Sequence, residues 1–169
     1  PGNSHIMKLL SPQQLHKLII KAHYDIEVSY LEGPCARIIS GCTDESVKLV
    51  SWIHIEQHTT KRAIASFRNQ KEAVKCYKRF HKIVSVSKTV EMDFRKILNI
   101  DASYQVLYNT NESKKIRGLS EESITIDIDQ ENTVNIVGVG KLLKSKGFDR
   151  ILRITKQLIA ENYSVHTYI

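Results

Sequence analysis

The feature that most constrains this chain is a repeated alternation between short segments rich in β-branched and aromatic residues and longer segments with helical spacing of apolar residues. The predicted strands are residues 24–31, 47–55, 82–87, 104–109, 134–139 and 163–169. The predicted helices are residues 11–23, 36–39, 59–80, 88–98 and 146–161, and Ser11 and Ser87 are predicted N-caps. Such alternation predicts right-handed βαβ units. The predicted fold class is therefore α/β, with Rossmann-like parallel sheets covered by helices on both faces.

Composition is typical of an ordinary globular protein. The 169 residues are 41% hydrophobic and 25% charged, which argues against disordered and fibrous classes. No apolar run approaches the ~20 residues that a membrane-spanning helix needs. The three cysteines form no CxxC pair, which argues for a reducing compartment and against a zinc site or a disulfide framework. Residues 1–7, PGNSHIM, are typical of a vector-derived scar.

The net charge of +7 is concentrated in one window of the sequence. Residues 54–96 hold eleven Lys or Arg and four Asp or Glu. Four lysines with helical spacing are expected to share one outer face in this window: Lys71, Lys75, Lys78 and Lys82. Such a surface is typical of proteins with an anionic partner, which can be nucleic acid, phospholipid or a phosphorylated substrate. A solvated helix face without a partner is the alternative.

Polar side chains follow the predicted strand 47–55, where parallel sheets bind ligands. His54 and His58 lie four residues apart, with Glu56 between them. Because His54 ends a strand, helical spacing of the two imidazoles is not assured, and the pattern is not the H-E-x-x-H metalloprotease signature. We therefore expect no metal site and interpret His54 as a donor to a substrate hydroxyl or phosphate near neutral pH. A surface or cap histidine is the alternative.

Residues 134–154 combine a predicted strand, a turn and a predicted helix. The turn contains two glycines and three lysines: Gly138, Gly140, Lys141, Lys144 and Lys146. It is not the dinucleotide fingerprint G-x-G-x-x-G, because Leu143 stands at the third position after Gly140, and it lacks the G-K-[ST] ending of a P-loop. Ammonium groups beside backbone N–H groups at a helix start nevertheless predict phosphate binding. A Gly-rich turn with solvated lysines is the alternative.

Several stretches of this sequence resemble a known family. They are VGVGKLLKSKGFDRILRI, KIVSVSKTVEMDF, VLYNTNESKKI, YDIEVSYLEGP and KLVSWIHIEQH. In order and spacing they resemble family-4 glycosyltransferases with the GT-B architecture, of the bacterial capsular and exopolysaccharide type. The resemblance covers nearly everything after the scar.

The resemblance implies retaining transfer of a sugar from a nucleotide-sugar donor to an acceptor, without a metal or a further cofactor. Lys146 matches the family's lysine that contacts the donor diphosphate, and Lys141 stands where the family usually has arginine. An ammonium keeps the charge but loses the planar fork, so bidentate phosphate binding is weakened. His54 matches a histidine near the transferred sugar. Gly138 and Gly140 would let the backbone approach the donor.

Departures from the family pattern lead us to expect a chain truncated at both ends. The family's first strand with its Gly-rich loop has no match here, and neither does its late pair of glutamates. The expected organisation is a partial acceptor-side domain (8–112), a connecting segment (113–133) and the start of a donor-binding domain (134–169). We expect such a chain to be inactive or nearly so by itself.

The same resemblance implies the partners and the location. We expect a nucleotide-sugar donor and a saccharide or lipid-linked acceptor, in the cytoplasm and peripherally at the inner face of the plasma membrane. The basic helix would contact anionic headgroups there. We do not expect nucleic acid as a partner, because Phe67, Tyr77 and Phe80 are predicted to face inward. The alternative function is a non-catalytic α/β module that binds an anionic partner through residues 54–96.

Overall fold

The computed structural model describes residues 7–123, 128 and 132–169. The chain forms two compact units, Pro1–Asn111 and Glu112–Ile169. Residues 124–127 and 129–131 of the expected connecting segment, like most of the predicted scar, lie outside the described residues.

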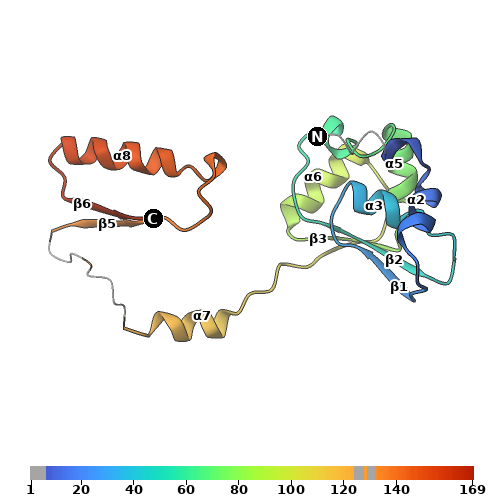
Figure 1. Ribbon diagram of the computed structural model, residues 1–169, viewed down its shortest axis with the longest axis horizontal. Coiled ribbons are helices and arrows are strands. Elements are labelled where there is room, and N and C mark those ends of the chain that lie inside the picture. The colour runs from blue at the N-terminus through green and yellow to red at the C-terminus, as the bar shows by residue number, and fades with distance from the viewer. Residues whose placement is uncertain (1–6, 124–127, 129–131) are drawn as a thin grey trace. The chain divides into compact units, whose positions relative to one another are not determined.

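The first unit contains a four-stranded parallel sheet in the order β1-β2-β3-β4 (Figure 1). Its strands are β1 (Ile26–Ser29), β2 (Lys48–Ile53), β3 (Lys82–Ser85) and β4 (Tyr104–Val106). Each strand pairs in parallel with the next along the chain, so that Val28 lies opposite Val50 and Trp52 lies opposite Val84. The sheet confirms the prediction of an α/β fold with parallel strands.

Helices of the first unit connect or flank these strands. They include α2 (Pro12–Ile19), α3 (Pro34–Ile39), α4 (Thr60–Ala63), α5 (Gln70–Tyr77) and α6 (Lys88–Leu98). The two predicted N-caps are confirmed, because the Ser11 hydroxyl accepts from Gln14 N–H and the Ser87 hydroxyl accepts from Val90 N–H. Helix α2 is shorter than predicted, since its C-cap Ile20 is already extended.

The prediction of one helix over residues 59–80 is wrong. The structure forms α4 and α5 instead, and residues 64–69 lie between them in turns and bends. Asn69 ends this break, because its side chain accepts from Glu72 N–H at 2.9 Å and begins a new helix. Lys82 lies on β3, within the predicted strand 82–87, so the expectation that it shares an outer helix face with the lysines of α5 is wrong.

Helices cover one face of the sheet in the first unit (Figure 1). The strands follow one another in chain order, and right-handed crossovers between such neighbours all pass over the same face. Burial therefore alternates along β1, where Glu27 and Ser29 face the helices, whereas Ile26 is 59% exposed and Val28 is 44% exposed. The expectation of helices on both faces is not met by the described residues of this unit.

The core lies between the sheet and these helices. Its largest fully buried apolar side chains come from β2, β3, α5, α6 and the segment before α5: Ile53, Ile83, Tyr77, Phe94 and Phe67. Phe67, Tyr77 and Phe80 all face inward, as predicted. Tyr77 also accepts a hydrogen bond from Gly33 N–H, and its burial raises the pKa of its hydroxyl far above the ordinary value.

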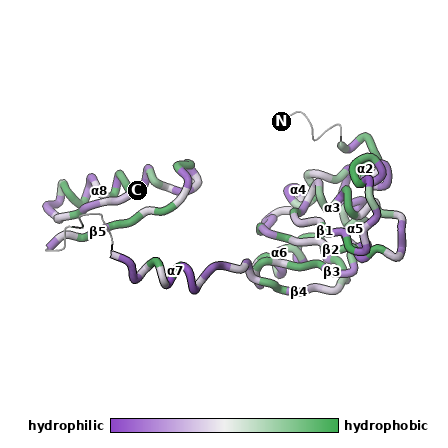
Figure 2. Tube along the Cα trace, turned by 60° about the horizontal axis from the view of Figure 1, so that its bottom comes forward, coloured by the Kyte–Doolittle hydropathy of each residue, from purple (hydrophilic) through white to green (hydrophobic). Residues whose placement is uncertain are grey.

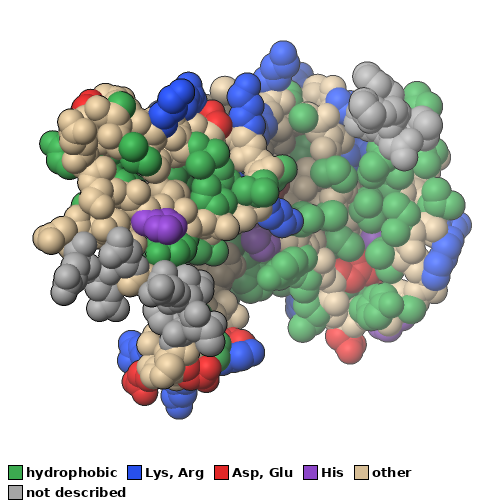
Figure 3. Space-filling view, turned by 60° about the vertical axis from the view of Figure 1, so that its left-hand side comes forward, with side chains coloured by type: hydrophobic (Ala, Val, Ile, Leu, Met, Phe, Trp, Pro, Cys, Tyr) green, Lys and Arg blue, Asp and Glu red, His purple; other side chains and the backbone are tan. Residues whose placement is uncertain are grey.

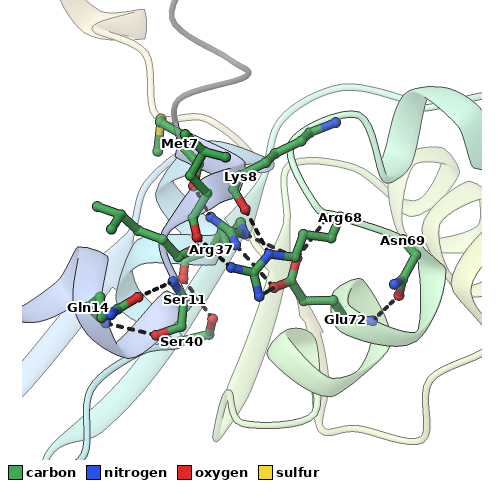
Figure 4. A network of polar contacts seen from close by, with 11 residues as sticks. Met7, Lys8, Ser11, Gln14, Arg37, Ser40, Arg68, Asn69 and Glu72 are labelled. Atoms are coloured by element: carbon green, nitrogen blue, oxygen red, sulfur yellow. Dashed lines mark hydrogen bonds and ion pairs between the residues drawn. The ribbon is translucent and has the colours of Figure 1, made fainter.

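A buried arginine ties the start of the chain to this core (Figure 4). Arg37 of α3 donates to both carboxylate oxygens of Glu72 on α5, at 3.2 and 3.0 Å. The same guanidinium donates to the carbonyl oxygens of Met7 and Leu10, at 2.6 and 2.8 Å. Arg68 donates to the neighbouring carbonyl of Lys8. Main-chain oxygens near the start of the described chain are thereby paired inside the protein.

The second unit is smaller and has its own parallel pair of strands. Its elements are α7 (Ser113–Ser120), β5 (Val134–Val137), the 3-10 turn η1 (Lys144–Lys146), α8 (Phe148–Ala160) and β6 (Val165–Tyr168). Helix α8 alternates between hydrophobic and hydrophilic residues, whereas α7 is largely hydrophilic (Figure 2). Phe148 is the buried residue of α8. Hydrophobic side chains are exposed on both units (Figure 3).

Candidate functional site

His54 directly follows β2 and lies at the carboxyl end of the parallel sheet. Its ring lies edge-on to Tyr30, with centroids 4.9 Å apart, and the Trp52 ring lies 6.4 Å from that of His54. Tyr30 and Trp52 are themselves 5.5 Å apart. Tyr30, Trp52 and His54, called the aromatic cluster below, stand on the face of the sheet that the helices leave open.

A cavity of about 600 Å³ adjoins the aromatic cluster. Besides the three rings, it is lined by the segment that follows β4: Leu107, Tyr108, Asn109 and Thr110. Its volume falls within the range of roughly 300–1,000 Å³ that is typical of small-molecule sites. The cavity therefore joins the carboxyl ends of β1, β2 and β4, which is the edge where parallel sheets bind ligands.

Two buried nitrogen atoms of the aromatic cluster lack a hydrogen-bond partner within the part of the chain that the structure describes. They are Nε1 of Trp52 and Nδ1 of His54. An unpaired buried polar atom costs about 1–3 kcal/mol, so each of these nitrogens needs a partner such as an ordered water or a bound ligand. The indole nitrogen can only donate, whereas an imidazole nitrogen donates or accepts according to its tautomer. Both nitrogens are buried, so a ligand hydroxyl group reaches them only if the ring that carries them turns toward the cavity.

Glu32 holds the main chain of the site in position. Its carboxylate accepts from His54 N–H at 3.2 Å and from the Gln57 side-chain amide at 3.3 Å. From the sequence, Glu32 and Gly33 are typical of an ordinary turn after the first strand. The only signal in the sequence was an acidic residue at the carboxyl end of a predicted strand.

His58 lies in a different environment from His54. It adopts a left-handed conformation, with φ of 60°. Its main-chain N–H donates to Asp93 of α6, and its Nδ1 lies 3.5 Å from Glu56. Residues 54–59 are not helical, so the two histidines do not share a helix face.

The glycine and lysine turn of the second unit wraps around the Phe148 ring. A Cβ atom on Gly138 would lie 3.1 Å from Cε1 of Phe148, so Gly138 allows close packing of strand and helix. A Cβ atom on Gly140 would lie 3.6 Å from the same ring and 3.9 Å from Cγ of Lys146. Gly140 and Lys146 are therefore neighbours. Gly147, with φ of 74°, then begins α8 in a conformation that favours glycine.

The charges around the start of α8 are mixed. Lys141, Lys144 and Lys146 are exposed, and Asp149 stands in the first turn of α8, where it pairs with Arg153 at 2.8 Å. A cavity of about 320 Å³ at this point is lined by Lys144 and Asp149 rather than by Lys141 or Lys146. An anion at this helix start would have to compete with the Asp149 carboxylate for the positive end of the helix dipole. The pattern of glycines and lysines in the sequence does not indicate this competition.

The basic face of α5 lines two further cavities. The first, of about 390 Å³, is lined among others by Arg68, Lys71 and Lys75. The second, of about 510 Å³, is lined by Lys71, Lys75, Lys78 and the apolar Val74, together with Gln70. This helix therefore presents cations beside concave surface.

A scan of the chain against protein-family models finds no match, and a comparison with curated proteins finds no relative. Among the described residues, no helix combines the length and the apolar character needed to cross a membrane.

Proposed function

We propose that this chain is part of a retaining glycosyltransferase of the GT-B type that transfers a sugar from a nucleotide-sugar to a saccharide or lipid-linked acceptor in surface polysaccharide synthesis. In this proposal residues 8–112 form the acceptor-side part and residues 134–169 form the start of the donor-binding part. His54 contacts the sugar. Lys146, assisted by Lys141, contacts the donor diphosphate.

The aromatic cluster is the observation that carries the proposal. A sugar ring has apolar C–H faces and a rim of hydroxyl groups. Aromatic rings match such faces, and a turn of the Trp52 or His54 ring toward the cavity gives its unpaired nitrogen a hydroxyl group as partner. A cavity of about 600 Å³ accommodates a saccharide of one to a few rings. Its position at the carboxyl edge of a parallel sheet agrees with where α/β folds bind ligands.

The turn before α8 supports the donor side of the proposal. In sugar transfer the leaving diphosphate gains negative charge, which preorganised cations and backbone N–H groups stabilise. Gly140 lies beside Lys146, and Gly147 begins a 13-residue helix directly after that lysine. In this proposal the Asp149 carboxylate stays paired with Arg153, so that Lys141 and Lys146 bind the diphosphate instead of pairing with Asp149.

Calorimetric titration with nucleotide-sugars and with the free nucleoside diphosphates tests the proposal. Lys146→Ala should weaken binding of both kinds of ligand by about tenfold or more, since charged hydrogen bonds contribute about 1.5–3 kcal/mol. Lys156→Ala, an exposed lysine further along α8, serves as the matched control and should change neither affinity. Equal loss in the two variants would show that only net charge matters and would count against a diphosphate site.

The lysines of α5 favour a second candidate function, which is a non-catalytic module for an anionic partner. Lys71 and Lys75 line both basic cavities, and Val74 supplies an apolar contact between them. Nucleic acid distinguishes this function from the first one, because a glycosyltransferase at the membrane would also bind anionic vesicles through the same helix. Lys75→Ala combined with Lys78→Ala should abolish binding of a labelled oligonucleotide under this second function and should leave nucleotide-sugar binding unchanged.

A further inference from the structure

Three side chains of the kinds that bind metal ions meet on the helix-covered side of β1, opposite to the aromatic cluster. They are His16 of α2, Glu27 of β1 and Cys42, which follows α3. One ligand atom from each lies within 4.8 Å of the other two. Nε2 of His16 and Oε2 of Glu27 lie 2.7 Å apart.

Burial makes this cluster unusual. The Glu27 side chain lies in the covered face of the sheet, where the residue is 6% exposed, and Cys42 is 2% exposed. A carboxylate is buried to this extent where it is paired or binds a metal, and here it is paired with His16. A divalent cation would take Cys42 as a thiolate, because a coordinating thiol loses its proton.

The packing of α2 against α3 fixes the position of the three groups. Gly41 lies directly against the Pro12 carbonyl, a contact that a Cβ atom would prevent. The next residue, Cys42, is thereby held beside the helix that carries His16. Arg79 donates to the Cys42 carbonyl at 2.5 Å and anchors the same main chain from the end of α5.

We propose that Nε2 of His16, a carboxylate oxygen of Glu27 and Sγ of Cys42 form a Zn²⁺-binding site. Zinc prefers nitrogen, sulfur and carboxylate ligands in a tetrahedral arrangement, with water at a position that the protein leaves open. Tetrahedral bonds to zinc place ligand atoms about 3.3–3.6 Å apart, so His16 and Glu27, now 2.7 Å apart, separate by roughly 0.6–0.9 Å when the ion enters. The Cys42 thiol proton passes to solvent, and His16 binds through Nε2 as a neutral imidazole that carries its proton on Nδ1.

Cobalt(II) titration of the reduced 169-residue protein tests the site, because a thiolate bound to cobalt gives a charge-transfer band in the near ultraviolet. The expected result is a band that saturates at one cobalt per chain and that one equivalent of Zn²⁺ bleaches. A variant with Cys35→Ala and Cys76→Ala keeps Cys42 as its only cysteine and should retain the band. Cys42→Ser should lose it.

His16→Gln should lower cobalt affinity by about 100-fold or more, since loss of a residue that merely orients a metal ligand already costs about 10–100-fold. His23→Gln is the matched control, because His23 is exposed and lies next to Asp44 instead. Circular dichroism shows whether each variant folds. Absence of the band in the single-cysteine variant, or its persistence in folded Cys42→Ser, would overturn the proposal. The single-cysteine variant decides the matter if Cys42→Ser does not fold.

Discussion

Glu72 is the residue on which the buried Arg37 guanidinium depends. Burial of the Glu72 carboxyl would raise its pKa, but hydrogen bonds from Arg37 and from Arg68 N–H outweigh it and hold the pKa below its ordinary value of 4.5. A carboxyl group with a lowered pKa stabilises the folded state above that ordinary value. Its contribution is lost as the pH falls below 4.5 toward the lowered value.

Glu72→Gln should therefore lower the free energy of unfolding at neutral pH by about 3–5 kcal/mol, since Arg37 would remain buried without its counter-ion. The variant should also lose part of the acid sensitivity of the native chain. Urea unfolding at several pH values, followed by Trp52 fluorescence, measures both effects. Glu45→Gln, at an exposed position, is the control and should change stability by less than about 0.5 kcal/mol.

Gly41 is a second residue with a defined steric role. Any Cβ atom there would collide with the Pro12 carbonyl and the following amide of α2. We expect Gly41→Ala to destabilise the first unit by about 3 kcal/mol, at the upper end of overpacking costs. Gly118→Ala is the matched control, because a Cβ atom added at this position of α7 would have nothing within 4 Å. The steric account would be contradicted if chemical denaturation gave the two variants equal stability.

At the scale of elements, the break between α4 and α5 depends on capping by Asn69. Its side chain accepts from Glu72 N–H, and Thr59 caps α4 in the same way through Arg62 N–H. Asn69→Ala should cost about 1 kcal/mol, whereas Asn69→Asp should be nearly neutral, since both Asn and Asp are good caps. Thermal unfolding monitored by Trp52 fluorescence distinguishes them. Equal losses would show that the cap is not what begins α5.

Helix α6 was predictable, because Ser87 caps it and its apolar positions recur at helical spacing up to Leu98. The break at residues 64–69 was not, because the apolar spacing of Ile64, Phe67 and Val74 is compatible with one continuous helix. The helix is interrupted because a turn buries Phe67 and because the Asn69 side chain caps the start of α5. Both depend on tertiary packing, which a single sequence does not display.

The candidate site also contains residues that the sequence predicts and residues that only the folded structure brings in. His54 was predictable from its place at the end of a strand, whereas its neighbours Tyr30 and Glu32 come from another strand and another turn. Their approach depends on the pairing of β1 with β2. The group of His16, Glu27 and Cys42 was missed for a similar reason, since its ligands come from three separate segments.

At the scale of the first unit, the one-sided helix layer has a measurable consequence. Ile26 on the open face is 59% exposed, whereas Ile83 on the covered side is fully buried. Ile83→Ala should cost about 2–5 kcal/mol through lost burial and a cavity. The same change at Ile26 should cost less than about 1 kcal/mol, which is the span of strand propensity. Urea unfolding compares the two variants, and equal costs would mean that the open face is covered in solution.

The most direct test of the proposed sugar site is a fluorescence titration, because Trp52 is the chain's single tryptophan and lies in the aromatic cluster. Nucleotide-sugars and oligosaccharides should shift or quench its emission in a saturable manner. His54→Ala should weaken that response by about tenfold, since the partner of a ligand hydroxyl is lost. Lys88→Ala, outside the cavity lining, should not change it. An emission spectrum that no saccharide alters, or one that responds equally in His54→Ala, would contradict a sugar site at this sheet edge.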